Sequence, residues 1–223
     1  MRAIAAIARK DLLVELRTKE SVPAMALFAV TTFVIFHFGL DRDRLEGELA
    51  AGVLWVTLLF AAILGINRLF VAEREQGGFD GILMAPIERT SLLLAKAGAL
   101  LVYLVALELI ALPVFALFFI EEGFWEAVPR LAAVILLADL GLAFVGAMLA
   151  SIAVHTRARD LLLPILLLPL TVPVVIGAAA ATKPLLSVPL ETSGVGKWLA
   201  VLALYDLVFG LLAYAVFDFL MED

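Results

Sequence analysis

The chain has 223 residues, of which 64% are hydrophobic and only 17% charged, and its mean hydropathy is +1.10. An ordinary soluble domain is about half apolar and about a quarter charged, so this composition excludes a fold that covers itself in water. The absence of cysteine excludes disulfides, thiol catalysis and Cys-based metal sites.

The N-terminal segment, residues 1–21, has closely spaced charges and no continuous apolar core, so we do not expect a cleaved signal peptide. Its apolar residues share one arc of a helix: Ile4, Ile7, Ala8, Leu12 and Leu16. Asp11 and Glu15 interrupt that arc and should face protein rather than anionic lipid. We expect an interfacial connecting helix that leads into the membrane. The alternative is a solvated helical tail.

Six apolar stretches are each long enough for a membrane-spanning helix of about 20 residues. They are residues 22–40, 49–71, 97–120, 131–154, 161–181 and 198–220. The segments between them are too short for a soluble domain, which rarely has fewer than about 50 residues. We therefore predict an all-α polytopic membrane protein in which residues 1–223 form one transmembrane domain. Any nucleotide hydrolysis would have to come from a bound partner.

The distribution of Lys and Arg predicts the orientation. If the N-terminus is cytoplasmic, the cytoplasmic segments carry eleven of these residues and the opposite side carries five. Both termini should therefore lie in the cytoplasm. Lys96 lies near a span end and is expected to snorkel toward the headgroups.

The longest predicted cytoplasmic connection is residues 73–91, EREQGGFDGILMAPIERTS. It combines charge, a Gly77-Gly78 break and a short apolar run that Pro86 should end. A short helix with exposed apolar side chains needs a cover, so we interpret the segment as a docking helix for a cytoplasmic partner. The alternative is an interfacial helix that dips into lipid.

The fourth and fifth spans have unusual compositions. Small residues in the fourth, Gly141, Gly146, Ala147, Ala150 and Ser151, predict close helix contact. The fifth carries Pro164, Pro169 and Pro173, which favour a bent or partly unwound helix suited to a gate. A static packing surface explains these prolines equally well.

Three acids lie inside predicted spans: Glu108, Asp139 and Asp206. A carboxylate at mid-membrane costs at least about 2.5 kcal/mol, so each should face the bundle, a cavity or a partner. They are candidates for intramembrane polar or gating roles. The alternative is a structural role, as protonated, hydrogen-bonded acids that hold helices together.

Enzymatic alternatives fit poorly, and we predict no catalytic residue and no metal site. Asp139 lacks the Gly-x-Gly that intramembrane aspartyl proteases place before an aspartate, and no serine neighbours His37 or His155 convincingly. A lone interfacial histidine is more often structural than a haem ligand. The string Gly194–Lys197 lacks the remaining residues of a phosphate-binding loop.

Several stretches together carry a family resemblance: RKDLLVELRTKES (9–21), GVLWVTLLFAAILGINRLF (52–70) running into EREQGGFDGILMAPIERTSLLLAK (73–96), LGLAFVGAMLASIAV (140–154) and LLPLTVPVVIGAAA (167–180). In this order they resemble the connecting helix, the second span with its coupling loop, and the fourth and fifth spans of the CcmB family. That family is the haem exporter protein B of cytochrome c maturation. The C-terminal span matches only in hydrophobicity.

The resemblance implies an ABC-2-type exporter permease in the bacterial cytoplasmic (inner) membrane, acting with a CcmA-like ATPase subunit and CcmC-, CcmD- and CcmE-like proteins. It also implies that the 73–91 loop carries a coupling helix seated in the ATPase. The residues expected at that interface are Glu75, Gly77, Gly78, Phe79, Asp80, Gly81, Ile82, Leu83, Met84 and Pro86.

We therefore predict a permease subunit that couples ATP hydrolysis by a partner to haem export or to release of a haem-loaded chaperone. The chain itself is expected to bind lipid but no cofactor and no nucleic acid. ATP and magnesium belong to the ATPase, and haem is a candidate ligand of the complex. Two copies are expected, because an ATPase dimer has two docking clefts; the alternative is a heteromeric membrane half with a CcmC-like protein. The alternative is an ion-coupled secondary carrier that uses the intramembrane carboxylates, and a third hypothesis is a purely structural scaffold.

Overall fold

The computed structural model describes residues 2–42, 44–71, 89–120, 123–153 and 159–220. Within these residues every regular element is a helix: α1 (Arg2–Thr18), α2 (Ser21–Gly39), α3 (Gly47–Arg68), α6 (Arg89–Phe119), α7 (Phe124–Ala153), α8 (Arg159–Leu185) and α9 (Val195–Leu220). All of these helices except α1 are long and apolar enough to cross a membrane. The predicted all-α, six-span fold is confirmed.

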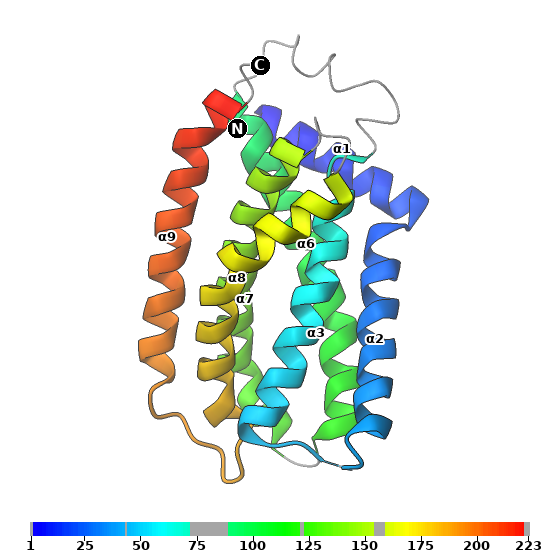
Figure 1. Ribbon diagram of the computed structural model, residues 1–223, viewed down its shortest axis with the longest axis vertical. Helices are drawn as coiled ribbons and strands as arrows, with labels where there is room; N and C mark the ends of the chain where they lie inside the picture. The colour runs from blue at the N-terminus through cyan, green and yellow to red at the C-terminus, as the bar shows by residue number, and fades with distance from the viewer. Residues whose placement is uncertain (1, 43, 72–88, 121–122, 154–158, 221–223) are drawn as a thin grey trace.

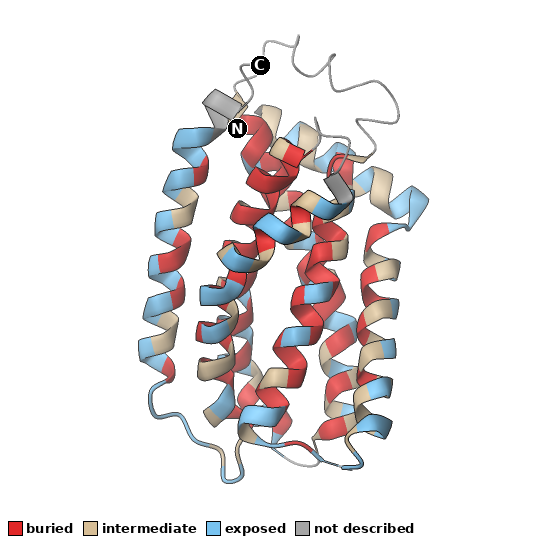
Figure 2. Cartoon of the chain, in the orientation of Figure 1, coloured by how far each residue is buried: buried red, intermediate tan, exposed pale blue. Residues whose placement is uncertain are grey.

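The six spans run side by side along the long axis of the molecule, and α1 lies across one end of the bundle (Figure 1). Helix α9 ends at the same end of the bundle as α1. Helix α7 packs against α3, α6, α8 and α9 and forms the centre of the bundle. The apolar windows of α3 and α7 are 72% and 67% buried, whereas those of α2 and α9 are only 22% buried. Figure 2 shows the corresponding exposed outer surfaces of α2 and α9.

Two helices begin well before the apolar stretches that predicted them. Helix α6 begins at Arg89 and α7 at Phe124, whereas the apolar stretches begin at 97 and 131. Hydropathy reports where hydrocarbon contact begins, but backbone hydrogen bonds continue a helix into its polar first turns. Lys96 lies in the early part of α6 that the apolar stretch did not include.

Glycines let the helices around α7 approach closely, as the small residues of its sequence predicted. A Cβ at Gly141 would lie 2.7 Å from Asp206 Oδ1 and 3.0 Å from Tyr205 Cε1, both on α9. A Cβ at Gly146 would lie 2.8 Å from Ile66 on α3. Contacts this short leave no room for a methyl group, so van der Waals packing of backbone against side chain joins these helices.

Helix α8 remains one continuous helix through Pro164, Pro169 and Pro173. It changes direction along its length in Figure 1, which agrees with a bent helix but not with a partly unwound one. The Thr171 hydroxyl donates to the carbonyls of Leu167 and Leu168, at 3.0 and 3.1 Å, and this type of bond bends helices.

Neighbouring helices fasten α8 on two sides. The Tyr205 hydroxyl of α9 donates to the Leu170 carbonyl at 2.8 Å, beside the Pro169 carbonyl that loses its helical donor because Pro173 has no N–H. At the far end of α8, the buried Trp55 indole of α3 donates to the Thr182 hydroxyl at 2.9 Å. Cross-helix hydrogen bonds of this kind hold the bend in place, and a gating role for the prolines stays a prediction.

We expect Gly141→Ala to lower the unfolding temperature in detergent, because the added methyl group overlaps the rigid Tyr205 ring. Overpacking of this kind costs about 1–3 kcal/mol. Gly98→Ala is the matched control, since a Cβ at Gly98 of α6 meets nothing within 4 Å. The control should be neutral or slightly stabilising. Equal unfolding temperatures for the two variants would contradict close packing at Gly141.

Candidate functional site

A buried ion pair joins α1 to the first turns of α6. Lys96 is 1% exposed and Asp11 is 7% exposed, and Lys96 Nζ lies 3.0 Å from Asp11 Oδ2. Lys10 Nζ lies 3.0 Å from Asp11 Oδ1, so two cations compensate the carboxylate. The expectation that Lys96 snorkels to the headgroups is wrong, because an internal carboxylate is within its reach.

The same ammonium group also holds the end of α3. Lys96 Nζ donates to the Leu69 carbonyl at 3.0 Å and lies 4.8 Å from the centre of the Phe70 ring. Leu69 follows α3 directly, where helical carbonyls have no donor of their own. One side chain therefore ties together α1, the end of α3 and the start of α6. We call these residues, Asp11, Leu69, Phe70 and Lys96, the junction.

A second hydrogen bond fastens α1 deeper on α6. The Tyr103 hydroxyl donates to the Asp11 carbonyl at 3.2 Å. Tyr103 follows Lys96 by two helical turns and therefore lies on the same face of α6. Helix α1 is thus held against α6 and is not a solvated tail.

Glu15 joins α1 to the first membrane-spanning helix. Its Oε1 accepts hydrogen bonds from the backbone N–H groups of Ser21 at 2.9 Å and of Val22 at 2.8 Å. These N–H groups open α2 and have no helical acceptor, and the next residue, Pro23, has no N–H. A carboxylate there also meets the positive end of the helix dipole. The expectation that Asp11 and Glu15 face protein is confirmed.

The junction lies at both ends of the predicted coupling loop. The helix before the loop ends at Arg68, and the helix after it begins at Arg89. The ten residues predicted to bind an ATPase lie outside the described residues: Glu75, Gly77, Gly78, Phe79, Asp80, Gly81, Ile82, Leu83, Met84 and Pro86. Their role stays a prediction. The helices on either side of the loop, α3 and α6, are described.

Two of the membrane acids pair with each other. Glu108 of α6 and Asp139 of α7 are 6% and 2% exposed, and their carboxyl groups lie close enough to form a hydrogen bond. Two carboxyl groups can form such a bond only when one of them carries the donated proton. The arrangement joins α6 to α7, as a structural role would require, and it is also a place where a proton can be held.

Asp206 of α9 is separate from that pair. It is 6% exposed, and its carboxyl group lies against Gly141 of α7. Neither of its oxygens has a hydrogen-bond partner among the described residues. The structure therefore does not bring the three acids into one cluster.

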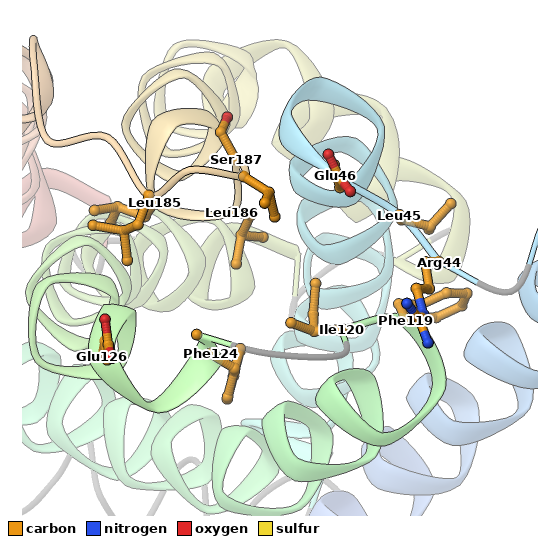
Figure 3. Close-up of a pocket in the computed structure, with 13 residues that line it drawn as sticks. Arg44, Leu45, Glu46, Phe119, Ile120, Phe124, Glu126, Leu185, Leu186 and Ser187 are labelled. Atoms are coloured by element: carbon orange, nitrogen blue, oxygen red, sulfur yellow. The ribbon is translucent and has the colours of Figure 1, made fainter.

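A pocket of about 370 Å³ opens at the end of the bundle opposite α1 (Figure 3). Its walls come from the connections that follow α2, α6 and α8, and include Arg44, Glu46, Phe119, Phe124 and Ser187. Two backbone hydrogen bonds link these segments. The Leu45 N–H donates to the Phe119 carbonyl at 3.0 Å, and the Gly47 N–H donates to the Leu186 carbonyl at 2.9 Å. These bonds join the residues after α2 to the end of α6 and the start of α3 to the residues after α8.

His37 packs beside this end in an aromatic cluster. Its ring centre lies 5.2 Å from that of Phe118 and 5.9 Å from that of Phe119. In the part of the chain that the structure describes, no three His, Asp or Glu side chains come together as a metal site would need. The arrangement around His37 is that of a packed histidine.

Sequence reasoning missed the junction, although both of its charges carried a signal. Lys96 is a cation in a run of apolar residues, and Asp11 is an anion on an otherwise apolar arc. Each is costly to bury alone, so each predicts a partner of opposite charge. The two charges therefore signal that partners exist, but not which residues they are.

A bundle of six apolar helices with its charged network at one end defines a multi-span membrane protein. The sequence model of the CcmB protein family matches residues 2–219. The heme exporter protein B of Bradyrhizobium diazoefficiens is 32% identical over 219 residues, which cover 96% of each chain. That of Paracoccus denitrificans is 36% identical over 162 residues, 72% of each chain. That of Escherichia coli K12 is 28% identical over 176 residues, 78% of this chain and 79% of the relative. This chain belongs to the CcmB family.

We expect Lys96→Met to lower the stability of the protein strongly, because it leaves Asp11 buried beside Lys10 alone. Removing one partner of a buried pair costs about 3–5 kcal/mol, and Lys10 should keep the loss at the low end. The double variant Asp11→Asn with Lys96→Met should recover much of the loss. Thermal unfolding in detergent of the wild type, both single variants and the double variant gives the coupling between the two residues.

The matched control is the exposed ion pair between Lys183 and Glu48 at the opposite end of the bundle. The cycle of Lys183→Met with Glu48→Gln should give no measurable coupling, since solvent screens the pair. If the stability losses of Asp11→Asn and Lys96→Met add up in the double variant, the two side chains stabilise the protein independently.

Proposed function

We propose that this chain is the permease subunit of an ATP-binding-cassette transporter that serves haem export in cytochrome c maturation. Support comes from its membership of the CcmB family and from a relative named heme exporter protein B that matches along 96% of its length. The chain is then a transporter subunit, and ATP and magnesium are bound by a CcmA-like partner. CcmC-, CcmD- and CcmE-like proteins complete the assembly.

The observation that carries the coupling role is the junction. Lys96 Nζ contacts the Leu69 carbonyl before the loop and the Asp11 carboxylate of α1, while Lys96 itself follows the loop. A force applied to the loop therefore reaches α1, α3 and α6 through one ammonium group. From α1 it passes to α2 through the Glu15 cap. A mechanical coupling device needs such a rigid connection between the docking segment and the spans.

The orientation of the chain in the membrane is inferred from the position of the coupling loop beside the junction. The end of the bundle that carries α1 and the junction faces the cytoplasm of a bacterial inner membrane, with both termini on that side. Closure of an ATPase dimer on nucleotide would pull the coupling segment and repack the spans beside α1. Two copies of this chain would occupy the two clefts of the dimer. The movement would drive haem export or release of a haem-loaded chaperone.

The test separates docking from coupling. Phe79→Asp with Leu83→Asp should abolish co-purification of the ATPase with the tagged chain, because two carboxylates cannot be buried in an apolar cleft without partners. Lys96→Met should keep the ATPase bound but reduce ATP-dependent release of the haem-loaded chaperone in a reconstituted complex. Lys183→Met, at the opposite end, is the matched control and should retain release.

Failure of the wild-type chain to bring down any ATPase would overturn the proposal. Full chaperone release by a folded Lys96→Met protein would show that the junction is not needed for coupling. It would not contradict docking of the ATPase at the loop.

An ion-coupled carrier is the second candidate, and the buried Glu108–Asp139 pair favours it because the pair can hold a proton between two spans. It predicts that vesicles containing this chain alone show transport driven by a proton gradient, and that Glu108→Gln abolishes it. We expect instead that Glu108→Gln retains ATP-dependent release, since an amide can replace the proton-donating carboxyl group in the hydrogen bond to Asp139. Reconstitution with and without the ATPase distinguishes the two.

A further inference from the structure

A lateral groove of about 410 Å³ runs between α7 and α9 and opens on the outside of the bundle. Leu140 and Phe144 line it on α7, and Asp206, Leu207 and Gly210 line it on α9. On α9 its lining residues recur at the spacing of one helix face. The groove therefore follows the two helices and is apolar everywhere except at Asp206.

Asp206 is the feature that sets this groove apart from an ordinary lipid-facing surface. Asp206 is 6% exposed, and both carboxyl oxygens lack a hydrogen-bond partner among the described residues. Its neighbour Tyr205 is bonded elsewhere, to the Leu170 carbonyl of α8. Charged or protonated, a carboxyl group in an apolar environment needs a polar partner.

The depth of Asp206 excludes water and lipid headgroups as that partner. Asp206 lies 11 residues after the start of α9 at Val195 and 14 residues before its end at Leu220. At 1.5 Å per residue, these separations are about 16 and about 21 Å. Asp206 is therefore near the middle of a hydrocarbon core about 30 Å thick, where headgroups do not reach.

A second copy of this chain does not supply the complementary charge. None of its 16 Lys and Arg residues lies near the middle of a span, by the helix bounds of the structure. A two-fold symmetric contact through α9 would instead bring one Asp206 toward the other, acid against acid. The complement must come from a different polypeptide.

The outer surface of α9 is built to receive a helix. Leu204, Leu207 and Leu211 are 60%, 59% and 61% exposed. Ala203 and Gly210, one turn before and one turn after Asp206, also line the groove and allow close backbone approach. We propose that the α7/α9 groove is the docking site for a transmembrane helix of another membrane protein, which places a Lys or Arg side chain on Asp206 at mid-membrane.

The chain contains no cysteine, so single cysteines can report on this surface without background. Gly210→Cys and Ala203→Cys lie in the groove, and Leu212→Cys, 43% exposed in the wild type, lies on the other side of α9. Each full-length variant is expressed in cells with the complete maturation machinery. The membranes are labelled with a thiol-directed benzophenone, and the adducts are mapped by mass spectrometry.

We expect the groove cysteines, and not Leu212→Cys, to cross-link to an apolar segment of a different polypeptide that carries Lys or Arg. The yield should fall about fivefold to thirtyfold when Asp206→Leu is added, the range expected for losing one polar contact between membrane helices. Asp206→Asn keeps the shape and one acceptor, and should lose less. Asp206→Lys combined with an acid at the mapped basic residue should restore the yield.

Three results would overturn the proposal. An adduct of twice the chain mass identifies a second copy as the occupant. Adducts with lipid alone show that the groove faces the bilayer. A protein adduct whose yield is unchanged in Asp206→Asn and Asp206→Leu shows that the carboxyl group does not bind the docked helix. Unfolding temperatures of all variants show whether a lost adduct reflects lost folding, and the outcome does not depend on ATPase coupling.

Discussion

Hydrocarbon offers no hydrogen-bond partner, and the polar groups of the membrane spans must find partners elsewhere. The backbone finds them by forming helices, and several polar side chains find them within the protein. The Trp55 indole donates to Thr182 across two helices, whereas the Thr57 hydroxyl donates to the Val53 carbonyl of its own helix at 2.7 Å. The Trp55 bond joins α3 to α8, whereas the Thr57 bond only satisfies a hydroxyl within α3.

The same constraint explains why an amphipathic N-terminal helix is attached to the bundle. Burial of Lys96 requires a carboxylate and an acceptor at one point, and Asp11 and the Leu69 carbonyl provide them. The apolar arc of α1 would also be satisfied by lipid, so hydrophobicity alone does not select α6 as its neighbour. The ion pair does, because a buried charge without its partner is far less stable than a solvated one. Electrostatics thus gives the junction its specificity, and hydrophobic packing gives the bundle its stability.

The sequence predicted what depends on local patterns and not what depends on distant partners. Six spans follow from the apolar runs, and the inward orientation of Asp11 and Glu15 follows from their places on an apolar arc. The starts of α6 and α7 were missed because charged first turns stay helical outside the apolar run. The pairing of Lys96 with Asp11 joins segments far apart in the chain, so no local pattern contains it. The hydrogen bond from Tyr205 to α8 likewise joins segments far apart in the chain. The predicted interface at residues 75–86 stays a prediction.

Most buried acids of this chain have polar partners within the chain itself. Asp11 has two lysines, Glu15 has the first N–H groups of α2, and Glu108 and Asp139 have each other. Each of these contacts joins two helices of the same chain, whereas Asp206 lines the α7/α9 groove and has no hydrogen-bond partner among the described residues. A buried acid without a hydrogen-bond partner inside the protein is the reason for proposing a contact outside it. Helix α7 forms one wall of that groove and packs on α6, which carries Lys96. A helix docked at Asp206 would therefore be connected through α7 and α6 to the end of the bundle where the coupling loop begins.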